Sequence, residues 1–102
     1  MSMGGAILVV DDEVSVRGLL RSVLQRDGFE VQVTANAEDA LEILQRADFD
    51  AVLADVVMPP GMDGVMLLEE IRKVDADLPV LLMTGYGTLD TAVDAMRRGA
   101  TD

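Results

Sequence analysis

Short apolar segments recur four times along the chain, and each is followed by a segment of mixed polarity. Residues 6–10 (AILVV) and 51–54 (AVLA) are continuous apolar runs, which are typical of strands buried on both faces. Residues 79–84 form a third such run, and its proline stands at the first position, where no ladder hydrogen bond is lost. Residues 29–35 alternate instead, which predicts a half-exposed strand at a sheet edge. The residues expected on its inner side are Phe29, Val31, Val33 and Ala35.

Apolar residues at helical spacing fill the intervals between these strands. The first predicted helix ends before Gly28, a suitable C′ residue, and the second begins at Asn36, with Asp39 three residues later. A third helix is expected over residues 64–74, and a fourth ends at Gly99. The residues expected on the inner faces are Val16, Leu19, Leu20, Val23 and Leu24, then Ala37, Ala40, Leu41 and Leu44, then Val65, Leu67, Leu68 and Ile71, and last Leu89, Ala92, Val93 and Met96.

This order of elements predicts an α/β fold. Strands that alternate with helices pair in parallel through right-handed crossovers. The alternating strand, the second in the chain, belongs outermost, so the expected strand order is 2-1-3-4 in a flavodoxin-like doubly wound sheet, without the fifth strand of that pattern. We expect one domain over residues 6–102, preceded by a disordered leader or cloning remnant at residues 1–5, which has no signal-peptide character.

Acidic and small polar residues follow the buried strands. In sheets of this type ligands bind at the carboxyl ends of the strands, and the first and third strands are expected to be neighbours. Their carboxylates would therefore converge, and they repel one another unless a proton or cation neutralises them. A hard divalent ion fits best: Mg²⁺, with Mn²⁺ or Ca²⁺ able to take its place. The residues concerned are Asp11, Asp12 and Glu13 after the first strand, Asp55 after the third, and Thr84 and Gly85 after the fourth.

A purely structural reading competes with this one. Asp12 could cap the first helix and Asp63 the third, because an aspartate between a strand and a helix is more often an N-cap than a ligand. Asp55 does not fit that reading, since two prolines separate it from any helix start. The acids in residues 48–50 (DFD) and 75–77 (DAD) precede their strands, so we expect solvated loop acids on the opposite rim.

Composition narrows the chemistry. The chain has no cysteine, which excludes thiolate metal sites and cysteine nucleophiles, and no histidine, which removes the usual general base and nearly all zinc chemistry. A net charge of −11 argues against direct nucleic-acid binding. No apolar run approaches the roughly 20 residues that cross a bilayer, so a cytoplasmic location without membrane contact is expected.

Taken together, these segments resemble the receiver domain of bacterial two-component response regulators, over essentially the whole chain from Ile7. The segment ILVVDDE resembles its first strand and acidic pair, DVVMP followed by GMDG resembles its phospho-acceptor segment, and PVLLMTGYG resembles its fourth strand. The last residues, MTGYGTLDTAVDAMRRGATD, further resemble receivers of nitrogen-regulator-class transcription activators.

The resemblance implies a role for each matching residue. Asp55 would accept a phosphoryl group from a sensor histidine kinase or phosphotransfer protein, and it would also bind the magnesium ion. Asp12 would be the main protein ligand of that ion, Asp11 would support it, and the backbone carbonyl of Val57 would complete the set.

Three further residues follow from the same resemblance. Thr84 would hydrogen-bond the phosphoryl oxygens and move when they arrive, and Gly85 would leave room for them. Tyr86 is either part of a signalling surface or an ordinary exposed loop aromatic.

Two features depart from the family pattern. The segment Pro59, Pro60 and Gly61 is one residue longer than usual, which affects the loop beside Asp55 and the Val57 carbonyl. The family also continues into a fifth strand with a catalytic lysine, followed by a last helix, whereas this chain ends at Asp102. Either the sequence continues in a longer protein, or a true truncation leaves a bare strand edge that invites pairing, for instance in a homodimer.

The leading hypothesis is a Mg²⁺-dependent phospho-accepting signalling module that switches an output domain outside this chain. It would not be an enzyme beyond catalysing its own phosphorylation and dephosphorylation. The alternative is a non-phosphorylated, receiver-like protein-interaction module. A small metal-dependent hydrolase has little support, because the sequence offers no second catalytic dyad.

Overall fold

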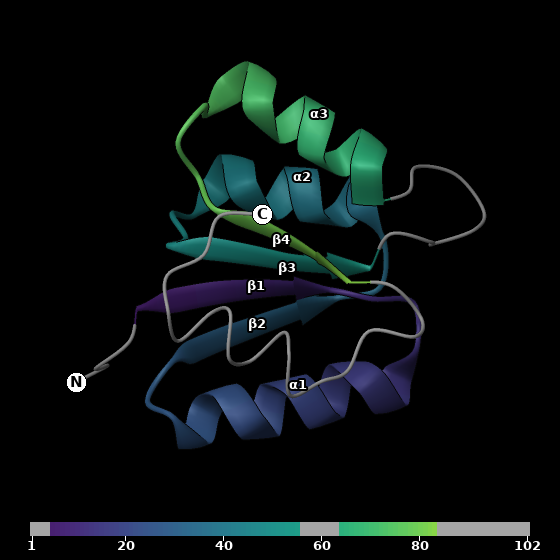
Figure 1. Ribbon diagram of the computed structural model, residues 1–102, viewed down its shortest axis with the longest axis vertical. Helices are drawn as coiled ribbons and strands as arrows, with labels where there is room; N and C mark the ends of the chain where they lie inside the picture. Colours follow the sequence, from purple (N-terminus) through teal and green to yellow (C-terminus); the bar gives the residue numbers. More distant parts are fainter. Residues whose placement is uncertain (1–4, 56–63, 84–102) are drawn as a thin grey trace.

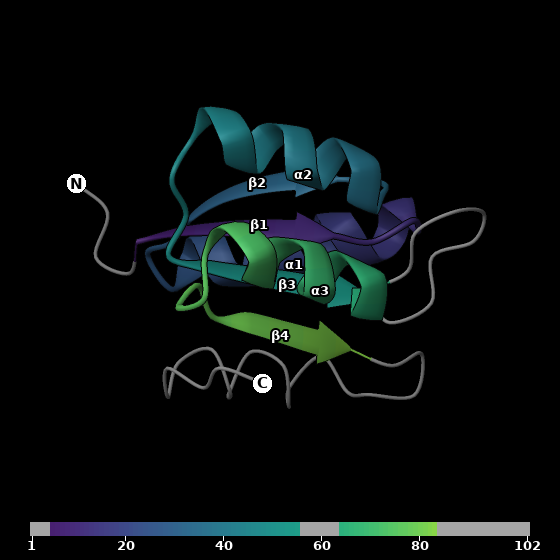
Figure 2. The same ribbon diagram turned by 90° about the horizontal axis from the view of Figure 1, so that it is seen from above.

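The computed structural model describes residues 5–55 and 64–83, which form a four-stranded parallel sheet with helices on both faces (Figure 1). Across the sheet, the second strand of the chain is followed by the first, the third and the fourth, so the predicted order 2-1-3-4 and the fold class are confirmed. Among the described elements, the first helix lies on one face of the sheet, and the second and third helices lie on the other (Figure 2). The elements are β1 (Ala6–Val10), α1 (Val14–Arg26), β2 (Glu30–Thr34), α2 (Ala37–Arg46), β3 (Ala51–Asp55), α3 (Gly64–Val74) and β4 (Val80–Met83).

Two hydrophobic cores explain why the central strands are apolar throughout. Side chains alternate across a strand, so neighbours in β1 enter opposite cores. Leu8 and Val10 belong to the cluster under α2 and α3, whereas Ile7 and Val9 belong to the cluster under α1. All four side chains are at most 1% exposed. The strand β2 lies at one edge of the described sheet and pairs with β1. Its residues alternate between exposed and half-buried up to Thr34, which is buried, as expected for an edge strand.

The predicted end of the first helix is confirmed in atomic detail. Gly28 has φ +95°, a conformation that favours glycine, and its N–H donates to the Gln25 carbonyl at 3.0 Å. The Phe29 N–H donates to the Leu24 carbonyl at 3.1 Å, which completes a Schellman motif. Phe29 and Leu24 also meet in the α1 core, so the chain enters β2 from a fixed direction.

The second helix begins where its capping residue predicts. Asn36 Oδ1 accepts a hydrogen bond from the Asp39 N–H at 2.8 Å, so the predicted N-cap is confirmed.

Three predicted inner-face residues are exposed instead. Leu19 in α1 is 52% exposed and Val65 in α3 is 43% exposed. Successive residues of a helix point in directions about 100° apart. The buried face of α1 centres on Leu20 and Leu24, and that of α3 on Leu67 and Ile71, so Leu19 and Val65 lie at the borders of these faces. Ala35 is exposed because β2 ends at Thr34, so the alternation no longer applies. The predicted fourth helix and residues 1–4 lie outside the described residues.

Candidate functional site

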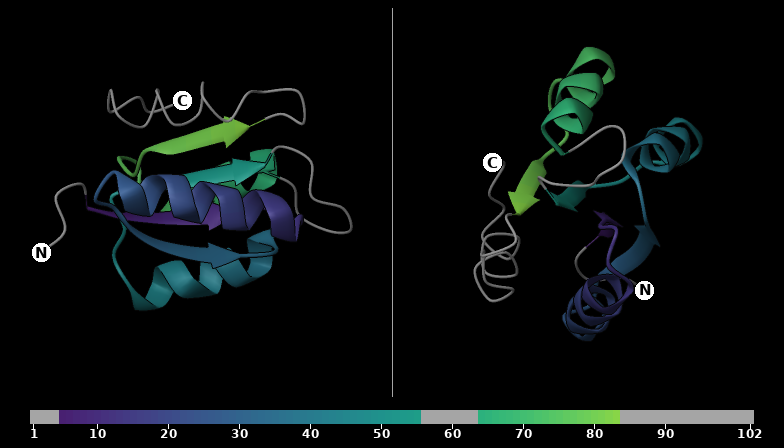
Figure 3. Two further views of the ribbon diagram at one scale, coloured as in Figure 1. Left: turned by 90° about the horizontal axis from the view of Figure 1, so that it is seen from below. Right: turned by 90° about the vertical axis from the view of Figure 1, so that its right-hand side faces the viewer.

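Three aspartates meet at the carboxyl edge of the sheet. β1 and β3 are adjacent and in parallel register, with Val10 opposite Ala54, so the residues that follow them, Asp11 and Asp55, share one edge. One carboxylate oxygen from each of Asp11, Asp12 and Asp55 can be chosen so that all lie within 4.8 Å of one another. Figure 3 (right) looks onto this edge from beyond the strand ends. The predicted convergence of these three acids is therefore present in the structure.

The three carboxylates differ in their access to solvent. Asp11 is 3% exposed, Asp55 is half-buried and Asp12 is exposed. The acidic site is therefore closed at its base and open to solvent on one side. A small ion or an incoming anionic group can approach from that side.

Burial makes this concentration of negative charge unfavourable. The pKa of Asp11 lies above its ordinary value, chiefly because burial disfavours the charged carboxylate. A hydrogen bond from the Glu13 N–H acts in the opposite direction, while the carboxylates of Asp55, Asp12 and Glu13 raise the pKa further. A divalent cation would relieve this repulsion, and a set of carboxylate oxygens suits a hard cation. The donor set thus fits a metal of the magnesium type.

The backbone around the acidic site is fixed by hydrogen bonds that the sequence did not reveal. The Asp11 N–H donates to the Thr34 carbonyl at 3.1 Å, which continues the ladder beyond the end of β1. The Glu13 N–H donates to Asp11 Oδ1 at 2.9 Å, and Arg17 Nη1 donates to the Asp11 carbonyl at 2.8 Å. Arg17 and Thr34 were not among the predicted site residues, because neither stands out in the apolar pattern.

The capping interpretation of Asp12 is wrong. The N-cap of α1 is Glu13, with an extended backbone, and its side chain makes no capping hydrogen bond. An Asp12 cap would require α1 to begin at residue 13, but α1 begins at Val14. The Asp12 carboxylate lies beside those of Asp11 and Asp55 instead. Other predicted residues lie outside the described residues, namely Val57, Pro59, Pro60, Gly61, Asp63, Thr84, Gly85 and Tyr86.

The acids of the opposite rim lie where predicted, but two of them have structural roles. Asp50 Oδ2 accepts the Ala6 N–H at 2.7 Å, and the Asp50 N–H donates to the Ala6 carbonyl at 2.8 Å, so this residue fastens the start of β1. Asp75 Oδ1 accepts the N–H groups of Asp77 and Leu78 at 3.0 and 3.1 Å. All four acids are exposed and lie in loops, so the expectation of solvated loop acids is confirmed. Asp50 and Asp75 additionally satisfy backbone donors, at the start of β1 and in the turn before β4.

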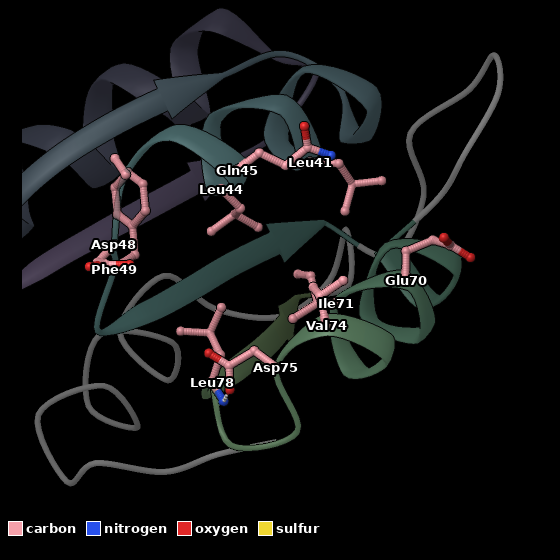
Figure 4. A pocket seen from close by; sticks show the side chains of 11 residues that line it. Leu41, Leu44, Gln45, Asp48, Phe49, Glu70, Ile71, Val74, Asp75 and Leu78 are labelled. Carbon is pink, nitrogen blue, oxygen red and sulfur yellow. Dashed lines mark hydrogen bonds between the residues drawn. The ribbon is translucent and has the colours of Figure 1, made fainter.

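A cleft of about 380 Å³ lies between α2 and α3, at the end of the sheet away from the acidic site (Figure 4). Its floor includes Leu44, Phe49 and Ile71, and its rim carries Asp48 and Glu70. The cleft therefore does not contribute to the acidic site.

Comparison with known proteins places the whole chain in one group of relatives. The family model described as the response regulator receiver domain matches residues 7–102. The response regulator protein FleR of Pseudomonas aeruginosa is 47% identical over 100 residues, which cover 98% of this chain and 21% of that protein. The transcriptional regulatory protein ZraR of Klebsiella oxytoca is 43% identical over 96 residues, covering 94% and 21%. This chain thus spans about a fifth of the length of these relatives.

Solved structures agree with the sequence comparison. NtrX from Brucella abortus, in complex with ADP, superposes with a TM-score of 0.80 at 40% identity, over 98% of this chain and 23% of that one. The response regulator TrrA from Thermotoga maritima, in complex with Mg²⁺-BeF, has a TM-score of 0.77 at 36% identity, over 98% and 82%. Within the described part of the chain, no helix is both long and apolar enough to cross a membrane.

Proposed function

This chain belongs to the response regulator receiver domain family, and from that membership we propose that Asp55 accepts a phosphoryl group in a Mg²⁺-dependent reaction. The observation that carries the proposal is the meeting of Asp11, Asp12 and Asp55 within 4.8 Å at the carboxyl edge of the sheet. The donor in this proposal is the phosphohistidine of a sensor histidine kinase or a phosphotransfer protein.

The backbone supports this assignment of Asp55 as the acceptor. Asp55 is the last residue of β3 and pairs with Met83 of β4, so its main chain is held by the sheet while its side chain is half-buried. An ionised carboxylate needs no general base to attack phosphorus, which suits a chain without histidine. The transfer then depends on position and on neutralisation of charge.

The proposed phosphoryl transfer forms one bond to phosphorus and breaks one. One carboxylate oxygen of Asp55 forms a bond to phosphorus while the P–N bond of the donor breaks, and that electron pair stays on the imidazole nitrogen. Asp11 and Asp12, together with Asp55 and the Val57 carbonyl, are the proposed ligands of Mg²⁺. The ion, when bound, would offset the charge of the carboxylates and of the arriving phosphoryl group. Mn²⁺ or Ca²⁺ could occupy the same oxygen ligands.

Residues outside the described part of the chain complete the proposal by family resemblance. Thr84 would hydrogen-bond the phosphoryl oxygens, Gly85 would leave space for them, and Tyr86 would belong to the surface that signals the change. The family is not in itself a catalytic enzyme family, so the proposed activity is limited to the domain's own phosphorylation and dephosphorylation.

The proposed partners of the whole protein are based on its similarity to longer relatives. Because the chain spans about a fifth of FleR and ZraR, we propose that the receiver, residues 6–102, acts on an output domain elsewhere in the protein, with transcription regulation as its effect. A cytoplasmic location, a homodimer and the absence of direct nucleic-acid contact by this acidic domain belong to the same proposal.

The test is phosphorylation of the purified protein with acetyl phosphate and Mg²⁺, read by intact mass. Wild type is expected to gain the mass of one phosphoryl group, and the gain should disappear with EDTA or in Asp55→Asn. Asp48→Asn, which removes the same charge from the opposite rim, should behave like wild type. If wild type stays unmodified while folded, the phospho-acceptor proposal fails and the receiver-like interaction module is favoured.

A further inference from the structure

We propose that Arg17 is a positioning residue for the acidic site. Its guanidinium group holds the backbone of the turn Asp11–Glu13, so that the carboxylates of Asp11 and Asp12 face Asp55. The inference deepens the proposed function, since it concerns the same carboxylates. It stands on the hydrogen bonds of the turn.

Arg17 reaches the turn through two different groups. Its N–H donates to the Glu13 carbonyl at 3.1 Å as the first hydrogen bond of α1. Its side chain runs back six residues, and Nη1 donates to the Asp11 carbonyl at 2.8 Å in a part-buried position. Arg17 therefore donates to two carbonyl groups of the three-residue turn and links the turn to the helix.

The carbonyl that Arg17 satisfies lies at a position where water is scarce. Asp11 is 3% exposed, and a buried carbonyl without a donor is unfavourable. The N–H of the same residue is used by the Thr34 carbonyl, and its Oδ1 is used by the Glu13 N–H. Loss of the guanidinium would thus remove the donor from the Asp11 carbonyl, while the N–H and the carboxylate of the same residue would keep their partners.

A role through charge alone makes the opposite prediction. If Arg17 served mainly to offset the carboxylates, its removal would make the site more negative, and Mg²⁺ would bind more tightly. The guanidinium, however, donates its hydrogen bond to the main-chain carbonyl of Asp11, which is a neutral group. If position matters, removal loosens the turn and Mg²⁺ binds more weakly.

The experiment therefore compares Mg²⁺ affinity in variants of one helix. Calorimetric titration with MgCl₂ is expected to show about fivefold to tenfold weaker binding in Arg17→Met, which keeps the apolar stem but loses a charge-assisted hydrogen bond. Arg17→Lys, with the charge kept and the planar fork lost, should fall between it and wild type. Arg21→Met removes the same charge from an exposed position one turn further on, and it should stay within about twofold of wild type.

A second measurement on the metal-free protein separates this inference from the proposed function. The Asp11 N–H donates a hydrogen bond to the Thr34 carbonyl, and its hydrogen exchange with solvent should be faster in Arg17→Met and in Arg17→Lys than in Arg21→Met. If wild type binds no Mg²⁺, the proposed function fails, whereas the amide comparison still decides the role of Arg17. Unchanged Asp11 exchange in both Arg17 variants, or Mg²⁺ binding as tight as in wild type, would overturn the positioning role.

Discussion

Neutralising one carboxylate of the acidic site should stabilise the metal-free protein. Asp55→Asn keeps the size of the side chain but removes its charge from a site that also holds Asp11 and Asp12. Most substitutions at a folded site destabilise a protein, so a gain in stability is a specific sign of repulsion. The variant should also respond less to Mg²⁺, because one of the three carboxylates of the acidic site loses its charge.

The distance between the carboxylates gives the size of this effect. The chosen oxygens lie within 4.8 Å of one another, and at that upper limit two unit charges repel by about 0.9 kcal/mol in water and by about 3.5 kcal/mol at an effective dielectric constant of 20. Asp12 is exposed and can turn away, whereas Asp11 is buried and cannot. We therefore expect the free energy of unfolding of Asp55→Asn to exceed that of wild type by about 1–2 kcal/mol at low salt.

Urea unfolding followed by far-UV circular dichroism measures this difference, which suits a chain without tryptophan. The measurement is made at pH 7 in EDTA and again in MgCl₂. At ten times its dissociation constant, Mg²⁺ should stabilise wild type by about 1.4 kcal/mol, so the gap between the two proteins should close. Asp48→Asn is the control, since it changes the net charge equally at an exposed position on the other rim.

Two results would contradict this reasoning. Asp55→Asn could be less stable than wild type in EDTA, which would mean that a contact of the carboxylate outweighs its repulsion. Alternatively, Asp48→Asn could be stabilised equally, which would assign the effect to the overall charge of −11 rather than to the acidic site.

Three further perturbations test other parts of the molecule. The pKa of Asp11 is higher in the folded protein than in the unfolded chain, where it is about 3.9. Metal-free wild type should therefore lose stability as the pH rises from the unfolded-state pKa through the folded-state pKa. Unfolding free energies from pH 4 to 7 should therefore show an advantage of Asp11→Asn that shrinks toward low pH. Leu24→Ala should cost about 2–5 kcal/mol of unfolding free energy because Leu24 is fully buried, whereas Leu19→Ala, at 52% exposure, should cost much less in the same urea titration. Gly5→Ala should lower the melting temperature, since φ is +87° and the new Cβ would overlap Asp50 Oδ2; Asp50→Ala removes that overlap, so the two changes should not be additive.

The sequence was sufficient for the topology and for the three acids because both depend on where apolar runs end. Val10 and Ala54 are the last apolar residues of their strands, and parallel pairing in register brings Asp11 and Asp55 together without further information. The roles of Val57, Thr84 and Gly85 depend on the resemblance instead, and they stay predictions.

The sequence was insufficient where the outcome depends on angle or on a single donor. Leu19 and Val65 have the right residue type for an inner face, but an apolar pattern defines the centre of a helical stripe better than its borders. The prediction for Asp50, a solvated loop acid, used only its charge and its position on the opposite rim. Its role depends on the Ala6 N–H, which lies beside it only because β3 pairs with β1.

Arg17 shows how a missed site residue follows from the fold once the topology is known. A strand that enters a helix through a three-residue turn places the helix N-terminus at the carboxyl edge of the sheet, and helical side chains lean toward that end. A long cationic side chain in the first turns of α1 is therefore directed back toward the acidic turn rather than away from it. Arg17 lies at such a position and is half-buried, whereas Arg21, one turn further on, is exposed. The rule that places the acids at the strand ends thus also places a long donor behind them, provided that the residue lies close enough to the helix start.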